Sequence, residues 1–304
     1  MTSRRKPAPR KTHRRAAGTL ALALAGAPLL AQAAPLDVFY ERTVMTAADA
    51  RCGLFTADIA TALAVGQAQA RGAALRAGAD EGQLAAVERR ARAAVARTGC
   101  GSRDIAVAAG RVREAFEGYS KMTRQTYPGD HAAWRADRER AQSARWRLAQ
   151  SASFGWDRMV FGMAGRENPG VLLAVAQFAD GKAPYTARLV MRDAGRSLGP
   201  YLDVRAADAK GQLPLARRLP PSALRSYSAE ARSPAGADLL PKDMKSGWAF
   251  RFPAQAARDL AQLDPREAVA VEFVFAGRED VVRRAYVEVG DFAAGQAFVR
   301  MAQR

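Results

Sequence analysis

Histidine and cysteine are scarce in this 304-residue chain, which has two of each. One histidine, His13, lies in a basic N-terminal segment, so a catalytic triad in the rest of the chain would have to use His131. A metal site with several histidine ligands is excluded for the same reason. His131 follows a turn in a polar stretch, and we expect it to be exposed to solvent.

Sequence motifs of several enzyme classes are missing as well. The chain has no glycine-rich phosphate loop, no Gly-x-Ser-x-Gly elbow, no His-Glu-x-x-His zinc motif and no calcium-binding loop. The sequence therefore predicts no cofactor and no metal, and it singles out no catalytic residue. Carboxylate catalysis stays open, because two acids distant in the chain can meet in the fold.

Long apolar runs are absent beyond the N-terminal segment. Residues 2–15 carry seven Arg or Lys and no acid, residues 16–30 are uncharged and rich in Ala and Leu, and Ala31-Gln32-Ala33 follows. This order is typical of a secretory signal peptide over residues 1–33, with cleavage between Ala33 and Ala34. The apolar run is shorter than the ~20 residues of a spanning helix, so we expect no transmembrane anchor after cleavage.

Export predicts a periplasmic or secreted protein. Twin arginines occur at residues 4–5 and 14–15, but neither pair is followed by the apolar residues typical of a twin-arginine signal. The general secretory route is therefore favoured, and the twin-arginine route stays open.

Acidic residues are fewer than basic ones, 30 against 47, and the net charge is +17. Residues 1–33 carry seven of the basic residues and no acid, which leaves 40 against 30 and a net charge of +10 in the mature chain. These charges are interspersed, as on a solvated surface. Because the protein is expected to be exported, nucleic acid is not an expected partner. We expect an envelope component instead, which could be a polymer, a lipid or a protein.

The two cysteines are expected to form a structural disulfide, because exported proteins fold in an oxidising compartment. Thr56 predicts the start of a helix over residues 57–72, and a short turn connects it to a second helix over 81–96. Helices joined by a short turn lie antiparallel, which places Cys52 and Cys100 at the same open end of this hairpin. A redox-active pair normally has Cys-x-x-Cys spacing, which is absent.

Further helices are expected before residue 146 and strands after it. Ser102 predicts the start of a third helix, and the polar stretch 132–145 is interpreted as a last one. Later apolar runs predict antiparallel strands, with helices over 253–263 and 290–301. The expected strands cover residues 154–163, 171–178, 187–192, 224–231, 248–252, 269–275 and 281–289.

The sequence thus predicts an α+β fold. A helical hairpin or bundle over residues 34–145 precedes a β-rich domain over 146–304, either sandwich-like or one curved sheet with two short helices. The segments 194–222 and 232–245 hold most of the Gly and Pro and are expected to be long loops.

Tryptophans and acids supply the candidate binding and catalytic residues. Trp146, Trp156 and Trp248 fall on strand patterns and are expected in the core, whereas Trp134 lies in a polar stretch and is expected to be exposed. Four acids fall on strand patterns, where burial of a carboxylate would be unusual: Asp157, Glu230, Glu272 and Glu288.

Five short sequences stand out in the mature chain: Tyr40-Glu-Arg-Thr43, Ala47-Ala-Asp-Ala-Arg-Cys52, Thr126-Tyr-Pro-Gly129, Phe154-Gly-Trp-Asp-Arg-Met159 and Gly290-Asp-Phe-Ala-Ala-Gly295. In these the chain resembles a group of uncharacterised exported proteins from GC-rich Gram-negative bacteria. The resemblance covers most of the mature chain. It implies an envelope location, and it implies no activity and no site residues.

Two functions fit these observations. The first is a non-catalytic periplasmic protein that binds or scaffolds a component of the envelope. The alternative is a secreted hydrolase that uses Asp or Glu carboxylates, with glycan as a candidate substrate.

Overall fold

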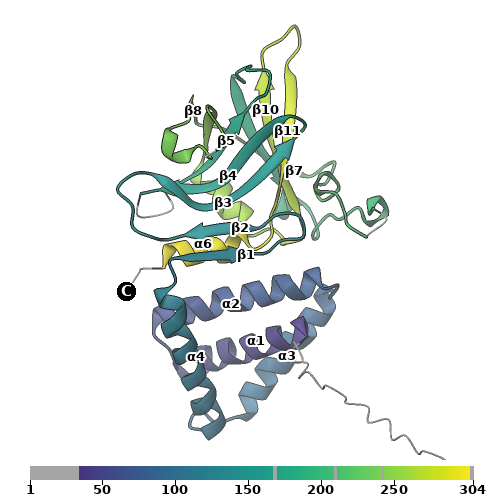
Figure 1. Ribbon diagram of the computed structural model, residues 1–304. Helices are drawn as coiled ribbons and strands as arrows, with labels where there is room; N and C mark the ends of the chain where they lie inside the picture. Colours follow the sequence, from purple (N-terminus) through teal and green to yellow (C-terminus); the bar gives the residue numbers. More distant parts are fainter. Residues whose placement is uncertain (1–33, 167–169, 209–210, 242, 302–304) are drawn as a thin grey trace, which may run out of the picture. The chain divides into compact units, whose positions relative to one another are not determined.

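Four helices form the first part of the computed structural model, which describes residues 34–166, 170–208, 211–241 and 243–301. They are α1 (Pro35–Cys52), α2 (Ala57–Arg76), α3 (Glu81–Arg97) and α4 (Arg103–Lys121) (Figure 1). The signal peptide expected over residues 1–33, including Ala33, lies outside the described residues. Ala34, on the other side of the expected cleavage site, immediately precedes α1.

Local sequence signals define the ends of these helices. Pro35 occupies the first turn of α1, where its missing N–H is not needed, and Gly53 ends α1 with a φ of +61°. The Asp80 carboxylate accepts a hydrogen bond from the Gln83 backbone N–H (2.7 Å) at the start of α3. Ser102 caps α4 as expected. Thr56 precedes α2 as expected but makes no side-chain cap bond.

The disulfide between Cys52 and Cys100 is confirmed, with a Cα–Cα distance of 5.7 Å. Its surroundings differ from the expected hairpin, because Cys52 is the last residue of α1, a helix that the sequence did not predict. Cys100 follows α3, so the bond connects the end of α1 to the end of α3. The helical part therefore contains one helix more than expected, and the disulfide connects this additional helix, α1, to α3.

Eleven strands are found among the described residues, and every hydrogen-bonded pair of them is antiparallel. They are β1 (Arg124–Tyr127), β2 (Trp134–Asp137), β3 (Arg145–Phe154), β4 (Asp157–Gly165), β5 (Val171–Gln177), β6 (Thr186–Arg192), β7 (Leu224–Ser228), β8 (Ala231–Pro234), β9 (Trp248–Phe252), β10 (Ala268–Phe275) and β11 (Val281–Glu288). One sheet has the order β1-β2-β3-β4-β5-β9-β8 and the other β11-β10-β6-β7. The predicted α+β class is confirmed.

Three expectations for the middle of the chain are wrong. The expected helix over 132–145 is replaced by β2 and the start of β3, since Trp134 and Ala136 alternate with polar residues at the period of a strand. The helical part ends at Lys121 instead of residue 145. The expected strand over 154–163 contains a two-residue hairpin turn at Gly155 and Trp156, because Phe154 pairs directly with Asp157 and Gly155 has a φ of +62°.

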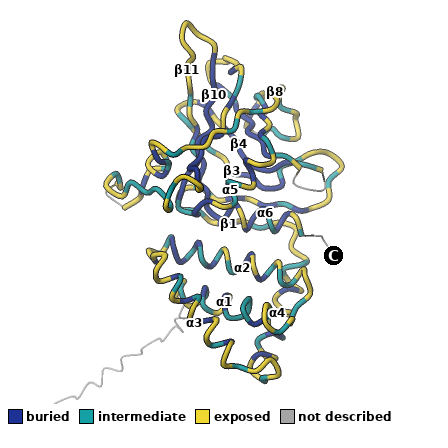
Figure 2. Tube along the Cα trace, turned by 180° about the vertical axis from the view of Figure 1, so that it is seen from behind, coloured by how far each residue is buried: buried dark blue, intermediate teal, exposed yellow. Residues whose placement is uncertain are grey.

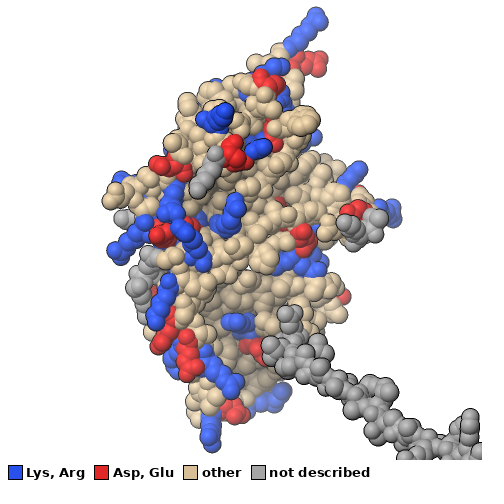
Figure 3. All heavy atoms as spheres, viewed as in Figure 1, with Lys and Arg blue, Asp and Glu red and all other residues tan. Residues whose placement is uncertain are grey.

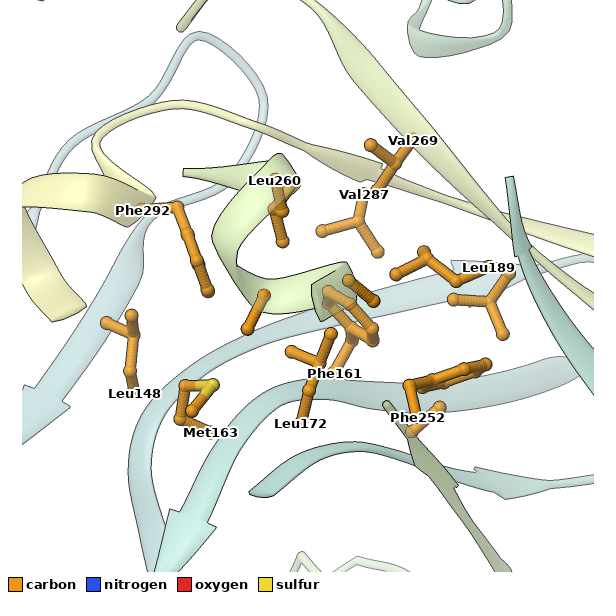
Figure 4. Packing of buried hydrophobic residues seen from close by; sticks show 14 of the residues in the cluster. Leu148, Phe161, Met163, Leu172, Leu189, Phe252, Leu260, Val269, Val287 and Phe292 are labelled. Atoms are coloured by element: carbon orange, nitrogen blue, oxygen red, sulfur yellow. The ribbon is translucent and has the colours of Figure 1, made fainter. Parts of the chain in front are cut away.

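The main core lies between the two sheets and includes two later helices, α5 (Ala254–Leu260) and α6 (Phe292–Arg300). Figure 4 shows Leu148, Phe161 and Leu172 of the larger sheet converging with Leu189 and Val287 of the smaller sheet, Leu260 of α5 and Phe292 of α6. The strands around this core are largely buried, whereas α3 and α4 expose much of their surface (Figure 2).

The helices and the sheets belong to one compact unit. Helix α2 packs against α6, and a Cβ atom at Gly72 would lie 2.8 Å from an Asp291 carboxylate oxygen. One turn further along α2, Arg76 forms a bidentate ion pair with Asp291, with N–O distances of 3.0 and 3.2 Å. A glycine and a buried ion pair therefore fix the distance between α2 and α6.

Candidate functional site

A pocket of about 560 Å³ lies between α1, α2, α4 and β1. Its volume falls in the range of small-molecule sites in proteins. The wall contributed by α2 contains Ala62 and Gly66, four residues apart on one helix face, and Ala115 of α4 also lines the pocket. Small side chains at these positions leave space that larger ones would fill.

The inner wall of the pocket is apolar. Leu63 and Val65 of α2, Phe116 of α4 and Tyr127 of β1 are all buried. Around them Met45, Ile59, Val112 and Met122 extend the apolar lining towards the surface, and Met122 is exposed. Such a wall suits an apolar ligand, because binding removes apolar surface from water on both sides.

Tyr119 and Tyr127 also line the pocket, and their hydroxyl groups lie next to each other, with no hydrogen bond to any other described residue. Both oxygen atoms are buried, and Tyr127 as a whole is 1% exposed. The two rings contact the Phe298 ring edge-on, with centroid distances of 5.5 and 6.4 Å. Aromatic contacts thus hold both rings in place, and the buried hydroxyls are closed off from the pocket.

Burial determines the protonation of these tyrosines. It raises the pKa of Tyr127, and the adjacent Tyr119 raises it further. Burial also raises the pKa of Tyr119, an effect that Tyr127 and Arg138 partly offset. Both groups are therefore protonated at neutral pH.

A buried arginine lies behind the two tyrosines. Arg138 donates from Nε to the Met122 carbonyl (2.7 Å) and from Nη2 to the Tyr119 and Ser120 carbonyls (2.7 and 2.8 Å). The guanidinium thus caps the C-terminal end of α4. No described carboxylate pairs with it, and its Nη1 has no partner among the described residues. Burial lowers the pKa of Arg138, yet a guanidinium stays charged at neutral pH. The potential near the tyrosines is therefore positive.

The mouth of the pocket is polar. Glu41 and Arg42 of α1 and Arg111 of α4 are exposed there, and Gln69 and Gln125 are half-buried. None of the three charged side chains forms an ion pair with a described residue. The pocket thus runs from a hydrated, mixed-charge mouth to an apolar interior.

The histidine and one of the strand acids belong to a structural cluster away from this pocket. Glu288 is completely buried, and its carboxylate accepts hydrogen bonds from the backbone N–H groups of Asp130, His131 and Ala132 at 2.8 to 3.1 Å. Gly129 makes this possible, since a Cβ there would lie 2.2 Å from the Ala132 carbonyl oxygen and 2.6 Å from Glu288. Two of the five short sequences lie next to these hydrogen bonds: residues 126–129 precede the donors at 130–132, and residues 290–295 follow Glu288.

His131 is exposed, as expected. Its Nε2 lies 2.9 Å from the Leu213 carbonyl oxygen and 3.1 Å from Arg218 Nη2. No described serine or cysteine contacts it, so the arrangement offers no nucleophile for it to activate.

The other three strand acids are either paired with arginine or solvated. Asp157 is buried and accepts from Arg283 at 3.0 Å, and buried Glu272 pairs with Arg188 and Arg284 at 2.8 and 2.6 Å. Exposed Glu230 lies 3.6 Å from Arg251. Each of these acids has an arginine beside it, and none of them lines the pocket between the helices.

The expectations for Trp134 and Trp156 are both wrong. Trp134 is completely buried in β2, and its Nε1 donates to the Glu288 and Val289 carbonyls at 3.1 and 2.9 Å. Trp156 is 91% exposed, because it lies at the tip of the β3–β4 hairpin. Trp146 and Trp248, which were expected in the core, are half-buried.

A shallow hollow beside Trp156 contains charged groups that are already paired with one another. Arg283 binds both Asp157 and Asp180, and Arg284 binds Glu272. Basic and acidic side chains are mixed over the molecular face in view in Figure 3. The hollow therefore offers no free charge to a ligand, in contrast to the pocket between the helices.

Within the described ranges, no group of three or more His, Cys, Asp or Glu side chains is arranged to hold a metal ion. In the same ranges, no helix combines the length and the apolar character needed to cross a bilayer.

The pocket residues were only partly visible in the sequence. Phe116 and Tyr119 lie on the helix whose start Ser102 predicted, but neither α1 nor β1, which contains Tyr127, was predicted. The signal that could have indicated a void is the pair of small residues Ala62 and Gly66 on an otherwise apolar helix face. Comparison of the chain with protein-family models, with curated proteins and with solved structures finds no match in any of the three.

Proposed function

We propose that this protein is a non-catalytic binding protein of the bacterial envelope and that it holds a small apolar molecule in the pocket between α1, α2, α4 and β1. The single observation that carries the proposal is this pocket of about 560 Å³, with its buried apolar wall and polar mouth. Of the envelope partners that the sequence left open, a lipid-like molecule fits such a lining best.

Export to the periplasm or secretion is part of the proposal. It is supported by the signal-peptide pattern of residues 1–33, by the resemblance to exported proteins and by the Cys52–Cys100 disulfide. A non-catalytic role is supported by the strand acids, each of which is paired, hydrogen-bonded to backbone or solvated, and by the position of His131 away from any nucleophile.

Fluorescence of an apolar dye tests the proposal. N-phenyl-1-naphthylamine emits strongly only in an apolar environment, and we expect its emission to rise on addition of the mature protein with a saturable, one-site dependence. Ala62→Phe places a ring in the pocket and should abolish this binding, since Ala62 lines the wall.

A matched control lies two residues further along the same helix. Ala64 is exposed and does not line the pocket, so Ala64→Phe should bind the dye like the original protein. Equal binding by both variants would show that the dye binds elsewhere, and absence of saturable binding by the original protein would contradict the proposed function.

A further inference from the structure

Trp156 exposes its indole ring at the edge of the shallow hollow beside the β3–β4 hairpin. The residue is 91% exposed, and it lines this hollow of about 510 Å³ together with Phe154 and with polar side chains of three other segments. Single exposed apolar residues are common on protein surfaces, but this one borders a concave site. The indole therefore offers a face on which a ligand ring can stack.

The polar side chains of the hollow are held in place by their own contacts. The Asp157 carboxylate accepts from the Ala179 backbone N–H at 2.9 Å and from Arg283 at 3.0 Å. The Arg283 guanidinium also lies 4.5 Å from the centre of the Phe275 ring. Groups that are fixed before binding lose little freedom when a ligand contacts them. The hollow is thus preorganised.

The charges of the hollow favour a neutral ligand. Two arginines and two aspartates line it, so their charges balance. Arg283 pairs with both aspartates, and Arg284 pairs with Glu272. A charged ligand would have to compete with these ion pairs, whereas a neutral ligand would leave them intact.

The same ion pairs leave hydrogen-bonding capacity for hydroxyl groups. Arg284 donates from Nε to Glu272, and its two Nη atoms form no hydrogen bond with a described residue. The Arg284 side chain is 57% exposed and the Asp180 side chain 38%. Both side chains line the hollow, so hydroxyl groups of one ligand can accept from Arg284 and donate to Asp180.

We infer that this hollow binds a neutral, β-linked glycan, with one pyranose ring stacked on the Trp156 indole and its hydroxyl groups bonded to Asp180 and Arg284. A pyranose with equatorial substituents has axial C–H groups on its faces, and these suit the electron-rich face of an aromatic ring. A polymer is among the envelope components that the sequence left open. The inference goes beyond the proposed function, since none of the described residues lines both the hollow and the apolar pocket.

Titration of the mature protein with chitohexaose, a neutral β-1,4-linked oligosaccharide, tests the inference. We expect saturable binding that shields Trp156 from iodide and shifts the tryptophan emission to the blue. Trp156→Ala should weaken the binding measured by calorimetry by about tenfold, because it removes the stacking surface. Since the sugar carries no charge, raising the salt concentration from about 50 to about 500 mM should change the affinity by less than about twofold.

Two arginines provide a matched pair of substitutions. Arg284 and Arg188 both bind Glu272, at 2.6 and 2.8 Å, but only the first of the two lines the hollow. Either substitution leaves Glu272 with the other arginine, so both variants should fold. We expect Arg284→Ala to weaken chitohexaose binding by about fivefold, the effect of losing a hydrogen bond, and Arg188→Ala to change it by less than about twofold.

Several results would overturn the inference. Absence of saturable binding of both chitohexaose and cellohexaose, which has the same linkage without acetamido groups, would contradict a glycan site. Unchanged binding by Trp156→Ala, or equal effects of the two arginine substitutions, would place the sugar outside the hollow. A loss of affinity by about tenfold at high salt would contradict recognition of a neutral ligand. None of these results affects dye binding in the apolar pocket, so the proposed function is tested separately.

Discussion

Arg76 of α2 and Asp291 at the start of α6 are 215 residues apart in the chain and form a bidentate, buried ion pair. The Arg76 side chain is 11% exposed and the Asp291 side chain 2%. Burial raises the pKa of Asp291 above its ordinary value, Arg76 lowers it in part, and Glu288 raises it again. The attraction of Arg76 therefore does not fully offset the cost of removing this carboxylate from water.

Replacing Arg76 with methionine should be strongly destabilising near neutral pH. The substitution leaves the Asp291 carboxylate buried without its cation, and we expect the free energy of unfolding to fall by about 3–5 kcal/mol at about pH 7. The pKa of Asp291 then rises further, so the group binds a proton more readily in the folded state than in the unfolded state. By linkage the loss shrinks as pH falls towards the ordinary Asp value of 3.8.

Urea denaturation at several pH values measures this effect, and Arg76→Met with Asp291→Asn is the control. Without an ionisable group at position 291, the pH dependence caused by the missing arginine should disappear. A loss of stability that stays the same from about pH 4 to about pH 7 would contradict the role assigned to the ion pair.

The Cys52–Cys100 bond should stabilise the helices more than the sheets, because it joins the ends of α1 and α3. The sequence separation of 48 corresponds to about 4 kcal/mol in the chain-entropy model. We expect Cys52→Ser with Cys100→Ser to lower the melting temperature while near-ultraviolet circular dichroism retains the signal of the packed β core. Thiol titration of the unfolded, unreduced protein should find no free thiol, and two free thiols would contradict the bond.

Gly162 should tolerate no side chain. Its φ is +154°, and a Cβ atom there would lie 1.9 Å from the Leu148 carbonyl oxygen on the neighbouring strand. We expect Gly162→Ala to cost about 3 kcal/mol or more, because backbone on β3 would have to move. Gly118→Ala on α4 is the matched control, with nothing within 4 Å of its Cβ, and should stabilise the protein by about 0.5–1 kcal/mol. Equal effects of the two substitutions in denaturation would contradict this account.

Trp156 should dominate the solvent-accessible tryptophan fluorescence, since it is 91% exposed. We expect Trp156→Phe to remove most of the emission that iodide quenches, to shift the remaining spectrum to the blue and to change stability by less than about 0.5 kcal/mol. Trp134→Phe should leave quenching unchanged and destabilise the protein, because Trp134 is buried and its Nε1 donates to two carbonyls. Reversed quenching results would contradict the placement of the two residues.

Local signals predicted the elements whose structure depends on local interactions. Ser102 caps α4, and β5 and β10 overlap the strands expected over 171–178 and 269–275. The expected helices over 253–263 and 290–301 correspond to α5 and α6. The disulfide also followed from the sequence, because two cysteines in a chain that is expected to be exported have few alternatives.

The failures concern residues whose environment is set by distant segments. Trp134 has polar sequence neighbours, but its ring contacts Phe292, 158 positions further along the chain, at a centroid distance of 5.0 Å. Trp156 lies in an apolar pattern that a two-residue turn interrupts. The pocket needs α1, α2, α4 and β1 together, and the alanine-rich α1 and α2 carry little periodic signal of which face is buried. No single segment therefore encodes the site.

Methyl NMR of the mature protein tests the central claim most directly. With carbon-13 in the methionine methyl groups, Met45 and Met122 report on the pocket, while Met159, Met163 and Met191 report on the β core. On titration with N-phenyl-1-naphthylamine, we predict saturable shifts of the Met45 and Met122 signals, unchanged β-core signals, and loss of the response in Ala62→Phe but not in Ala64→Phe. Shifts confined to the β-core methionines, or no shift of Met45 and Met122 at saturating dye, would contradict binding in this pocket.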